Sequence, residues 1–559
     1  MRLCSLSSWA AKIAFAIFCA DFLTMLLMNT LRLYTQWLPV LFFSLLAATG
    51  IWIFRSNLLP TSEPSYLSVR EQRLLLFVVG AVLLIFAGMR LPYLLEGSFH
   101  HLVGPVVYDD TWHFSEINSL VNSIRYPAHY SLIPSQYFSL YYAPWMLIAA
   151  LYLAFPVHGF TIKAAFAIGC TIYQVLVCLT LLYVGMNHAR SRRHFYWALY
   201  LIGCWAGISS LFALIVPMQH NSFWMACFGM QIELFNYFVL STWAIHHLSA
   251  TGAIVLCWHI WDISKKKDWR VIACSSVLIS YAFYSSVFVF LGALPMGIFV
   301  ASLSLRKHWK SVLVSTGLAG ALIWPLLWIY LGKPHKIGFI IPFISGIQFT
   351  SKRFPFVSAI SGGEWAGFFL FIILLCCNFF PHVLALIFRG KELDWHKRIL
   401  IAMAIGFLLS TYFIGFPEGN SYASRGSIIP VMVLGWICAE LLPGIRIRAL
   451  VAIGLLLGAL GSIQEAFWVY TQTIQISRTS LGGHYSESIL KINQDRHMRT
   501  IPEKQVSAAV MDYPYMNYYI EKFVPGGKHP LVMPDYELAC NGPHGLWRWQ
   551  KITEASDLP

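Results

Sequence analysis

Long apolar stretches recur along most of the chain and are separated by short segments that carry most of its charge. A helix needs about twenty apolar residues to cross a bilayer. The stretches near this length are 9–30, 36–54, 74–92, 164–186, 195–216, 239–262, 271–287, 288–304, 311–331, 364–388, 399–416, 426–443 and 449–470. The pair covering 271–304 has a second interpretation, a single broken helix. The pattern predicts an all-α polytopic membrane protein with about 13 transmembrane helices.

Basic residues between these stretches predict their orientation, because Lys and Arg collect in cytoplasmic loops. They are Arg55, Arg70, Arg73, Arg190, Arg192, Arg193, Lys265, Lys266, Lys267, Arg306, Lys307, Lys310, Arg446 and Arg448, together with the basic segment 389–398. Their positions predict a cytoplasmic N-terminus and a C-terminus on the outer side. The first stretch is long for a signal-peptide core and lacks a clear small-residue cleavage site, so we expect a retained anchor.

Residues 138–156 conflict with this order, although they are apolar enough to cross at the short limit. If they crossed, the basic segment 187–194 would face the outside. Pro144 and Pro156 also bracket the stretch. We therefore expect an interfacial or re-entrant helix that lies against the outer face.

This topology divides the chain into two parts. Residues 1–471 form the transmembrane bundle, with outer-face loops at 93–163, 217–233, 332–363 and 417–425. Residues 472–559 form a polar outer C-terminal region, rich in Tyr, Pro and Gly, which we expect to be a small ordered cap. Internal repeats are not visible, so the sequence gives no support to a transporter built from repeats.

Composition supports the membrane assignment. Hydrophobic residue types make up 58% of the 559 residues and charged types only 11%, whereas soluble chains are about 25% charged. The net charge of +14 is explained by topology, and no polar basic domain suggests nucleic-acid binding. Most of the twelve cysteines lie in apolar stretches, with no CxxC pair. The absence of an Asn-x-Ser/Thr acceptor favours a bacterial protein, hence the inner membrane with a periplasmic C-terminus.

The densest polar group of the first outer loop runs from Tyr108 to Glu116. Ile117, Leu120, Val121 and Ile124 follow at helical spacing, so a helix beginning near Asp110 would bury them on one face. Asp109, His113 and Glu116 would form a neighbouring stripe. One interpretation is that Asp109 or Asp110 caps the helix and the others form a solvated face. The other is a catalytic carboxylate, because adjacent acids repel and one can become a base near neutrality, with His113 and Glu116 in support.

A second polar group, 416–427, joins two spans on the outer side and places Arg425 where the next helix enters the bilayer. Arg425 is either a snorkelling interface anchor or a phosphate clamp, because guanidinium binds phosphate oxygens through two parallel hydrogen bonds. Lys333 and Lys336 make the third outer loop basic, against the inside bias. Either a long loop is exempt from that bias, or an anionic lipid headgroup or lipid-linked phosphate binds there.

Three histidines, His246, His247 and His259, lie within or near one span. We expect them to be packed or hydrogen-bonded rather than metal ligands. Charged residues otherwise lie almost entirely at span ends, with Glu465 as the main exception.

The layout resembles the GT-C superfamily of membrane glycosyltransferases, which carry many spans and an acidic motif in the first large outer loop, beside interfacial helices. The residues that carry the resemblance are 108–113 (Tyr-Asp-Asp-Thr-Trp-His), and the 420–427 segment is similar to one in bacterial membrane proteins of this type. The resemblance implies a donor sugar carried on polyprenyl phosphate, and a glycan, lipid or protein acceptor.

The resemblance also implies roles for individual residues. Asp109 or Asp110 would be the general base that takes a proton from the acceptor hydroxyl, with inversion at the anomeric carbon. Arg425 would bind the donor phosphate, with Tyr422, Lys333 and Lys336 beside it. Mg²⁺ or Mn²⁺ could bind at Asp109 and Asp110, since some members of the superfamily use a metal and others do not.

Two other classes fit the same spans. A membrane transporter or a lipid or oligosaccharide flippase would be expected to carry ionisable residues near the middle of spans. A non-catalytic scaffold is the third possibility, and the acidic group of the first outer loop argues against it.

Overall fold

The structure is a computed structural model of the chain, and part of the chain can be described from it. The described residues are 2–61, 66–95, 113, 116–117, 119–121, 123, 125–130, 133–137, 142–155, 162–205, 237, 240–241, 244–331, 372–373, 375–411, 413, 425–445, 452, 455–456, 458, 500–501, 536–539 and 548–551.

Five helical segments of the described part are long and apolar enough to cross a membrane. They are Leu3–Thr30, Thr35–Arg55, Val69–Met89, Ala164–His188 and Val287–Leu327. They belong to α1 (Leu3–Thr30), α2 (Leu38–Arg55) with the short helix before it, α3 (Val69–Met89), α7 (Ile162–His188) and α14 (Val287–Leu331). The chain is therefore a helical, multi-pass membrane protein, and the predicted total of about 13 spans stays a prediction.

Apart from η1, which is the short helix before α2, the remaining elements fall outside this group. The helices are η1 (Thr35–Trp37), α4 (Leu91–Leu95), α6 (Trp145–Ala154), α8 (Arg192–Gly203), α12 (Ile245–Ile263), α13 (Trp269–Ser285), α17 (Phe380–Arg389), η3 (Gly390–Glu392), α18 (Trp395–Ser410), α20 (Ile428–Leu441) and η4 (Leu442–Gly444). The antiparallel strands are β1 (His129–Tyr130) with β2 (Ile133–Tyr137), and β3 (Thr500–Ile501), β4 (Tyr536–Ala539) and β5 (Arg548–Lys551) in that order. The second sheet lies in the predicted C-terminal region.

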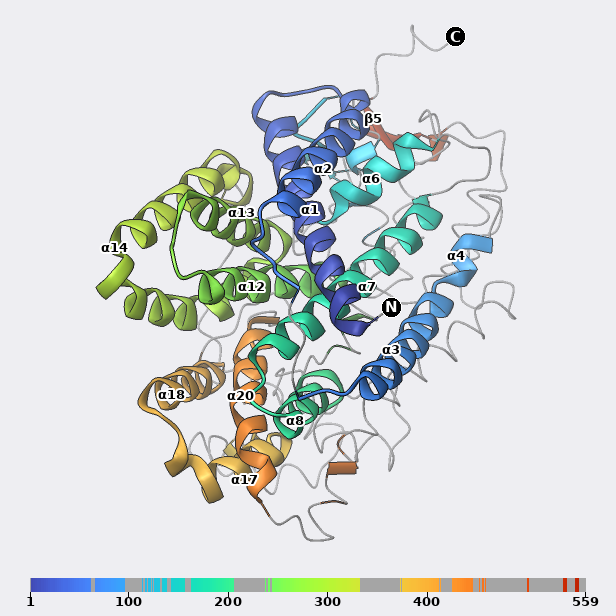
Figure 1. Cartoon of the computed structure of the whole chain (residues 1–559). Helices are drawn as coiled ribbons and strands as arrows, with labels where there is room; N and C mark the ends of the chain where they lie inside the picture. The colour runs from blue at the N-terminus through green and yellow to red at the C-terminus, as the bar shows by residue number, and fades with distance from the viewer. Residues whose placement is uncertain are drawn as a thin grey trace, which may run out of the picture.

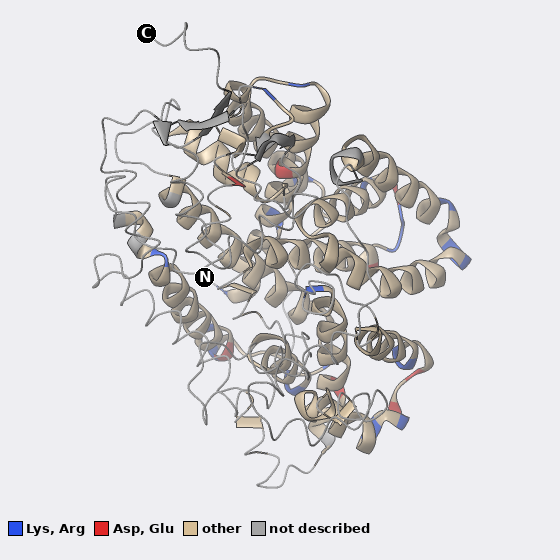
Figure 2. Ribbon diagram, turned by 180° about the vertical axis from the view of Figure 1, so that it is seen from behind, with Lys and Arg blue, Asp and Glu red and all other residues tan. Residues whose placement is uncertain are grey.

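Helix α1 lies at the centre of the arrangement and packs against α2, α7 and α13 (Figure 1). Helices α12, α13 and α14 form one group beside it, and α8, α17, α18 and α20 form another (Figure 1). Among the described residues, most charged side chains belong to helix ends and connecting turns, and the helices between them are almost entirely uncharged (Figure 2). Helices surrounded by lipid hydrocarbon require this distribution, because a charged side chain inside the bilayer is energetically costly.

Several helix starts follow from local sequence. Ser68 and Glu71 form a capping box at the start of α3, in which each side chain binds the other residue's backbone N–H. Asp268 caps α13 and Asp394 caps α18 from one side only, with the carboxylate accepting from first-turn amides. These caps fix where polar turns end and apolar helices begin.

The uncertain region 271–304 contains two helices rather than one. Ser286 adopts an extended backbone conformation between α13 and α14. The predicted spans 288–304 and 311–331 both fall on α14, which has non-helical backbone angles at His308, within the predicted basic turn. Ser276 Oγ donates to the Ser315 carbonyl at 3.0 Å, so α13 lies directly against the second half of α14.

Helix α6 has ten residues, which span about 15 Å at 1.5 Å per residue. The hydrocarbon core is about 30 Å thick, so α6 by itself cannot cross. It is buried against α1, α2 and α7. This length fits the prediction that 138–156 does not span, although the ends of that stretch lie outside the described residues.

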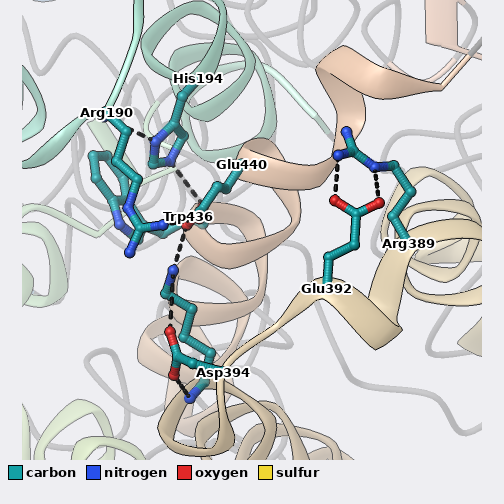
Figure 3. A network of polar contacts seen from close by, with 8 residues as sticks. Arg190, His194, Arg389, Glu392, Asp394, Trp436 and Glu440 are labelled. Carbon is teal, nitrogen blue, oxygen red and sulfur yellow. Dashed lines mark hydrogen bonds and ion pairs between the residues drawn. The ribbon is translucent and has the colours of Figure 1, made fainter.

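Two predicted basic loops meet at one end of the bundle. Arg190 Nη1 and Lys397 Nζ bind the two oxygens of Glu440 at 2.5 and 2.6 Å (Figure 3). Lys397 also pairs with Asp394, and His194 Nε2 lies 3.2 Å from the Trp436 carbonyl oxygen. We call Arg190, His194, Asp394, Lys397 and Glu440 the Glu440 network. It joins the starts of α8 and α18 to the end of α20, as alternating spans require.

The first predicted outer loop is tied to the C-terminal end of α1. The Tyr126 N–H donates to the Leu33 carbonyl at 3.0 Å. The Tyr142 hydroxyl donates to Asn29 Oδ1 at 3.2 Å, and Thr35 Oγ1 donates to the Ser123 carbonyl. These bonds place the described part of the loop over the bundle, beside the helix ends that carry the candidate site.

Candidate functional site

Residues around 113–121 are helical where the structure describes them, and their apolar face is buried. Ile117, Leu120 and Val121 are buried, which confirms the predicted stripe for these three residues. Ile124 lies outside the described residues. The hydrophobic spacing therefore identified the helix and its core-facing side correctly.

His113 and Glu116 are also buried, with exposed fractions of 3% and 0%. The alternative in which these two residues form a solvated face is therefore wrong. His113 Nδ1 lies 2.9 Å from Glu116 Oε2. The pair faces protein rather than water because the helix that carries it packs beneath neighbouring helix ends.

Burial, together with the positive charges of Arg90 and Arg425, lowers the pKa of His113 to about 3. The imidazole is therefore neutral near pH 7 and donates its Nδ1–H to Glu116. In this tautomer Nε2 is an acceptor. Nε2 is buried and has no hydrogen-bond partner among the described residues.

Aromatic rings from three other elements surround His113. The ring centroids of Trp145, His246 and Phe166 lie 4.8, 5.0 and 6.1 Å from that of His113. Trp145 begins α6, Phe166 lies in the first turns of α7, and His246 lies in the first turn of α12. Residues that are distant in sequence therefore meet at one set of helix ends.

Two arginines complete this group. Arg90 follows α3, is buried, and places its guanidinium carbon 5.1 Å from the centroid of the Phe166 ring. Arg425 precedes α20, is half-buried, and interacts electrostatically with His113, His246 and His247. We call Arg90, His113, Glu116, Trp145, His246 and Arg425 the His113 cluster.

Two glycines explain how Arg425 reaches this position. A Cβ on Gly292 of α14 would lie 1.8 Å from the Gly426 carbonyl oxygen, and a Cβ on Gly426 would lie 2.8 Å from the Phe407 ring. Side chains at either position would push the backbone before α20 away from α14 and α18. The Gly pair therefore sets the place of the adjacent arginine.

His247 bonds to Ser286 Oγ at 2.8 Å, at the break between α13 and α14. This confirms for His247 the expectation of a hydrogen-bonded histidine. His259 likewise bonds to His188, at 2.8 Å. Within the part of the chain that the structure describes, no group of three or more His, Cys, Asp or Glu side chains is placed to hold a metal ion.

The other predicted site residues are Asp109, Asp110, Tyr422, Lys333 and Lys336, and all five lie outside the described residues. Their roles stay predictions, and so does a metal at the two aspartates. Of the predicted site residues, the structure places His113, Glu116 and Arg425, and it brings these three together.

Sequence reasoning overlooked Arg90, although a signal was present. Arg90 lies at the predicted outer end of the 74–92 span, where the positive-inside rule disfavours it. It also overlooked Asp21, which lies within α1 and is fully buried. The statement that Glu465 is the main exception to charges at span ends is therefore wrong, since Asp21 is a second one.

The His113 cluster brings together two guanidinium groups, a neutral imidazole and a carboxylate, of which all but the half-buried Arg425 are buried. Guanidinium groups bind phosphate strongly, and low local polarity strengthens such an interaction. A neutral imidazole with an acceptor nitrogen can bind a hydroxyl group. This set of groups is suited to a ligand that combines an anion with hydroxyl groups.

Comparison with known proteins adds no assignment. The chain matches no family model, no curated protein and no solved structure.

Proposed function

We propose that the chain is a glycosyltransferase of the GT-C type, which moves a sugar from a polyprenyl-phosphate-linked donor to an acceptor hydroxyl at the outer face of the membrane. The observation that supports this proposal most directly is the His113 cluster. It joins the helix that follows the Asp109–Asp110 pair to Arg425, from the far part of the chain. A base and a phosphate-binding group must be neighbours for this reaction.

In the proposed reaction, the acceptor oxygen attacks the anomeric carbon as the bond from that carbon to the phosphate oxygen breaks. Polyprenyl phosphate leaves with the bonding electron pair, so the configuration inverts. Asp109 or Asp110 takes the proton of the acceptor hydroxyl. Arg425 stabilises the charge that develops on the departing phosphate. His113 and Glu116 hold the helix and supply hydrogen bonds beside the base.

The test is release of polyprenyl phosphate from a panel of polyprenyl-phosphate sugars by purified full-length variants. Asp109→Asn, Asp110→Asn and the double variant remove basicity but keep size. We expect loss of the base to lower the rate by about 10²- to 10⁴-fold. Asp394→Asn is the control, because Asn also caps a helix and Asp394 lies in the Glu440 network. Wild-type rates in all three Asp109 and Asp110 variants would remove the proposed base.

The predicted topology is part of this proposal. About 13 spans, a cytoplasmic N-terminus and a periplasmic C-terminus would put the His113 cluster at the outer face and the Glu440 network at the inner face of a bacterial inner membrane. The support is that the predicted inner loops 187–194 and 389–398 meet at Glu440. A reporter fused after Pro559 should behave as exported; a cytoplasmic signal would contradict the orientation.

A transporter or flippase for a lipid-linked substrate is the second candidate. Asp21 favours it, because a buried carboxylate inside a span is typical of ion or proton pathways. The two candidates therefore differ in what they require of Asp21: a transporter needs a carboxylate that changes its charge or binds a cation, whereas a glycosyltransferase does not.

A further inference from the structure

Asp21 lies within the apolar helix α1 and is fully buried. Its Oδ1 accepts a hydrogen bond from the Leu147 N–H at 2.9 Å, and its Oδ2 contacts the Tyr173 hydroxyl. The titratable groups near it are Cys19 on α1, Tyr173 on α7 and Tyr281 on α13. In the described part of the chain, no Lys or Arg pairs with Asp21. An ionised carboxylate there would lack the cation that such burial normally requires.

The hydrogen bonds of Tyr173 bear on the state of Asp21. The Tyr173 hydroxyl contacts Asp21 Oδ2 and also lies 3.1 Å from the Pro144 carbonyl oxygen. A phenol has one proton, so it cannot donate fully to two acceptors. If Asp21 were ionised, the Tyr173 hydroxyl could donate to only one of the two oxygens, and the other contact would place two acceptor oxygens together with no proton between them. With a protonated Asp21, both contacts become hydrogen bonds.

We infer that Asp21 is a neutral carboxylic acid that, together with Tyr173, clamps the first turn of α6. The Leu147 N–H donates to Asp21 Oδ1, the Asp21 O–H donates to Tyr173, and the Tyr173 O–H donates to the Pro144 carbonyl. Helix α6 begins after Pro144 and has no side-chain cap of its own. The first amides of a helix lack intrahelical partners. Asp21 on α1 supplies the partner for one of these amides, the Leu147 N–H.

The clamp gives Asp21 a positioning role at the His113 cluster. Trp145 is the first residue of α6, between the two clamped backbone groups, and its ring centroid lies 4.8 Å from that of His113. Fixing this turn therefore fixes one wall of the cluster. The inference stands on hydrogen bonds alone and does not depend on glycosyl transfer. It assigns the buried acid of α1 to structure rather than to ion transport.

The first experiment compares unfolding temperatures of purified full-length variants. Asp21→Asn keeps an acceptor for Leu147 and a donor for Tyr173, as a neutral acid does, so we expect it to unfold like the wild type. Asp21→Leu removes both groups and Tyr173→Phe removes the bridge, and each should unfold several degrees lower. Tyr183→Phe is the control, because Tyr183 is on the same helix and makes one hydroxyl–carbonyl bond, at 2.8 Å to Pro60.

Tyr173→Phe should be more destabilising than Tyr183→Phe, because it breaks two bonds rather than one. Wild-type unfolding in both Asp21→Leu and Tyr173→Phe would overturn the clamp. Asp21→Asn as unstable as Asp21→Leu would overturn it as well, since the neutral mimic would have failed.

The second experiment observes the proton and remains decisive if Asp21→Leu does not fold. The infrared spectrum of the wild type minus that of Asp21→Asn, at pH 7, should contain the carbonyl band of a protonated carboxylic acid, shifted in D₂O. Carboxylate bands in place of this one would show that Asp21 is ionised and would overturn the inference. That result would also strengthen the transporter alternative.

Discussion

The His113 cluster and the Glu440 network both bring charged side chains from distant helices together, but they differ in their access to water. His113, Glu116 and Arg90 are buried. In the Glu440 network His194 is buried as well, but the ion-pairing side chains are accessible to water: Arg190 and Asp394 are 64% and 49% exposed, and Lys397 and Glu440 are 20% exposed. An exposed ion pair changes the folding free energy little, because water solvates both charges in either state. Burying a charged group costs several kcal/mol of folding free energy unless other groups compensate it, so about that much is at stake in the His113 cluster.

The comparison teaches where to look for function. The positive-inside rule already explains the basic residues at the Glu440 end, because they lie in predicted cytoplasmic loops. Each acid there pairs with a Lys or Arg side chain that water also reaches (Figure 3). The His113 cluster instead gathers two arginines and a carboxylate around a buried, neutral histidine, and buried groups with shifted pKa values are typical of functional sites. We infer a functional reason for their presence there.

The largest difference should appear in activity when one arginine is removed from each region. Arg425→Ala should lower the rate of sugar transfer by about 10²- to 10³-fold, because an electrostatic stabiliser of the transition state contributes about 3–4 kcal/mol. Arg190→Ala, which removes an exposed partner of Glu440, should leave the rate within about twofold. The measurement is the initial rate of polyprenyl phosphate release.

Arg425→Lys sharpens this comparison. It keeps the charge but loses the two-pronged geometry, so its rate should lie between those of Arg425→Ala and the wild type. Equal rates for Arg425→Ala and Arg190→Ala would remove the distinction between the two regions in catalysis.

A smaller difference should appear in stability. Glu116→Ala leaves the buried Nδ1–H of His113 without its 2.9 Å acceptor and should cost about 2–4 kcal/mol of unfolding free energy. Glu392→Ala removes a carboxylate that binds Arg389 but is 51% exposed, and should cost less than about 1 kcal/mol. Denaturant titration in detergent micelles measures both. A Glu392 variant as unstable as the Glu116 variant would contradict the role given to burial.

The sequence predicted parts of the molecule whose signals are local. Run length identified α1, α2, α3 and α7, because about twenty apolar residues in succession suit only a membrane helix. Helical spacing identified the buried face of Ile117, Leu120 and Val121. The break at Ser286 was left open, because a small polar residue between two apolar runs allows either one helix or two.

Contacts between helix ends were not predictable in the same way. That His246 and Trp145 would pack on His113 depends on how four helices pack together, and no spacing within one segment records this. Asp21 was overlooked because a single acid in a long apolar helix breaks no periodic pattern. Its partners, Leu147 and Tyr173, become visible only in the fold.

The smallest expected difference between the regions is in pH dependence. Burial lowers the pKa of His113 to about 3, below its ordinary value of 6.5. As the pH falls below about 6.5 the unfolded chain takes up this proton and the folded chain does not, so the stability from neutral His113 is present above pH 6.5 and is lost toward pH 3. Between pH 7 and pH 5, the titration of this one group should lower the unfolding free energy by about 2 kcal/mol.

Other groups titrate over the same range, so the effect of His113 must be isolated. Denaturant titrations at pH 7 and pH 5 give the loss of unfolding free energy for the wild type and for His113→Gln, and the difference between the two losses is the contribution of His113. His194→Gln is the matched variant of the Glu440 network. Burial also lowers the pKa of His194, but the Trp436 carbonyl and Glu440 raise it, so its contribution should be smaller. If His113→Gln lost as much stability as the wild type on acidification, His113 would be charged in the folded protein. Its Nε2 would then be a donor, and the cluster would present one acceptor fewer to a bound hydroxyl group.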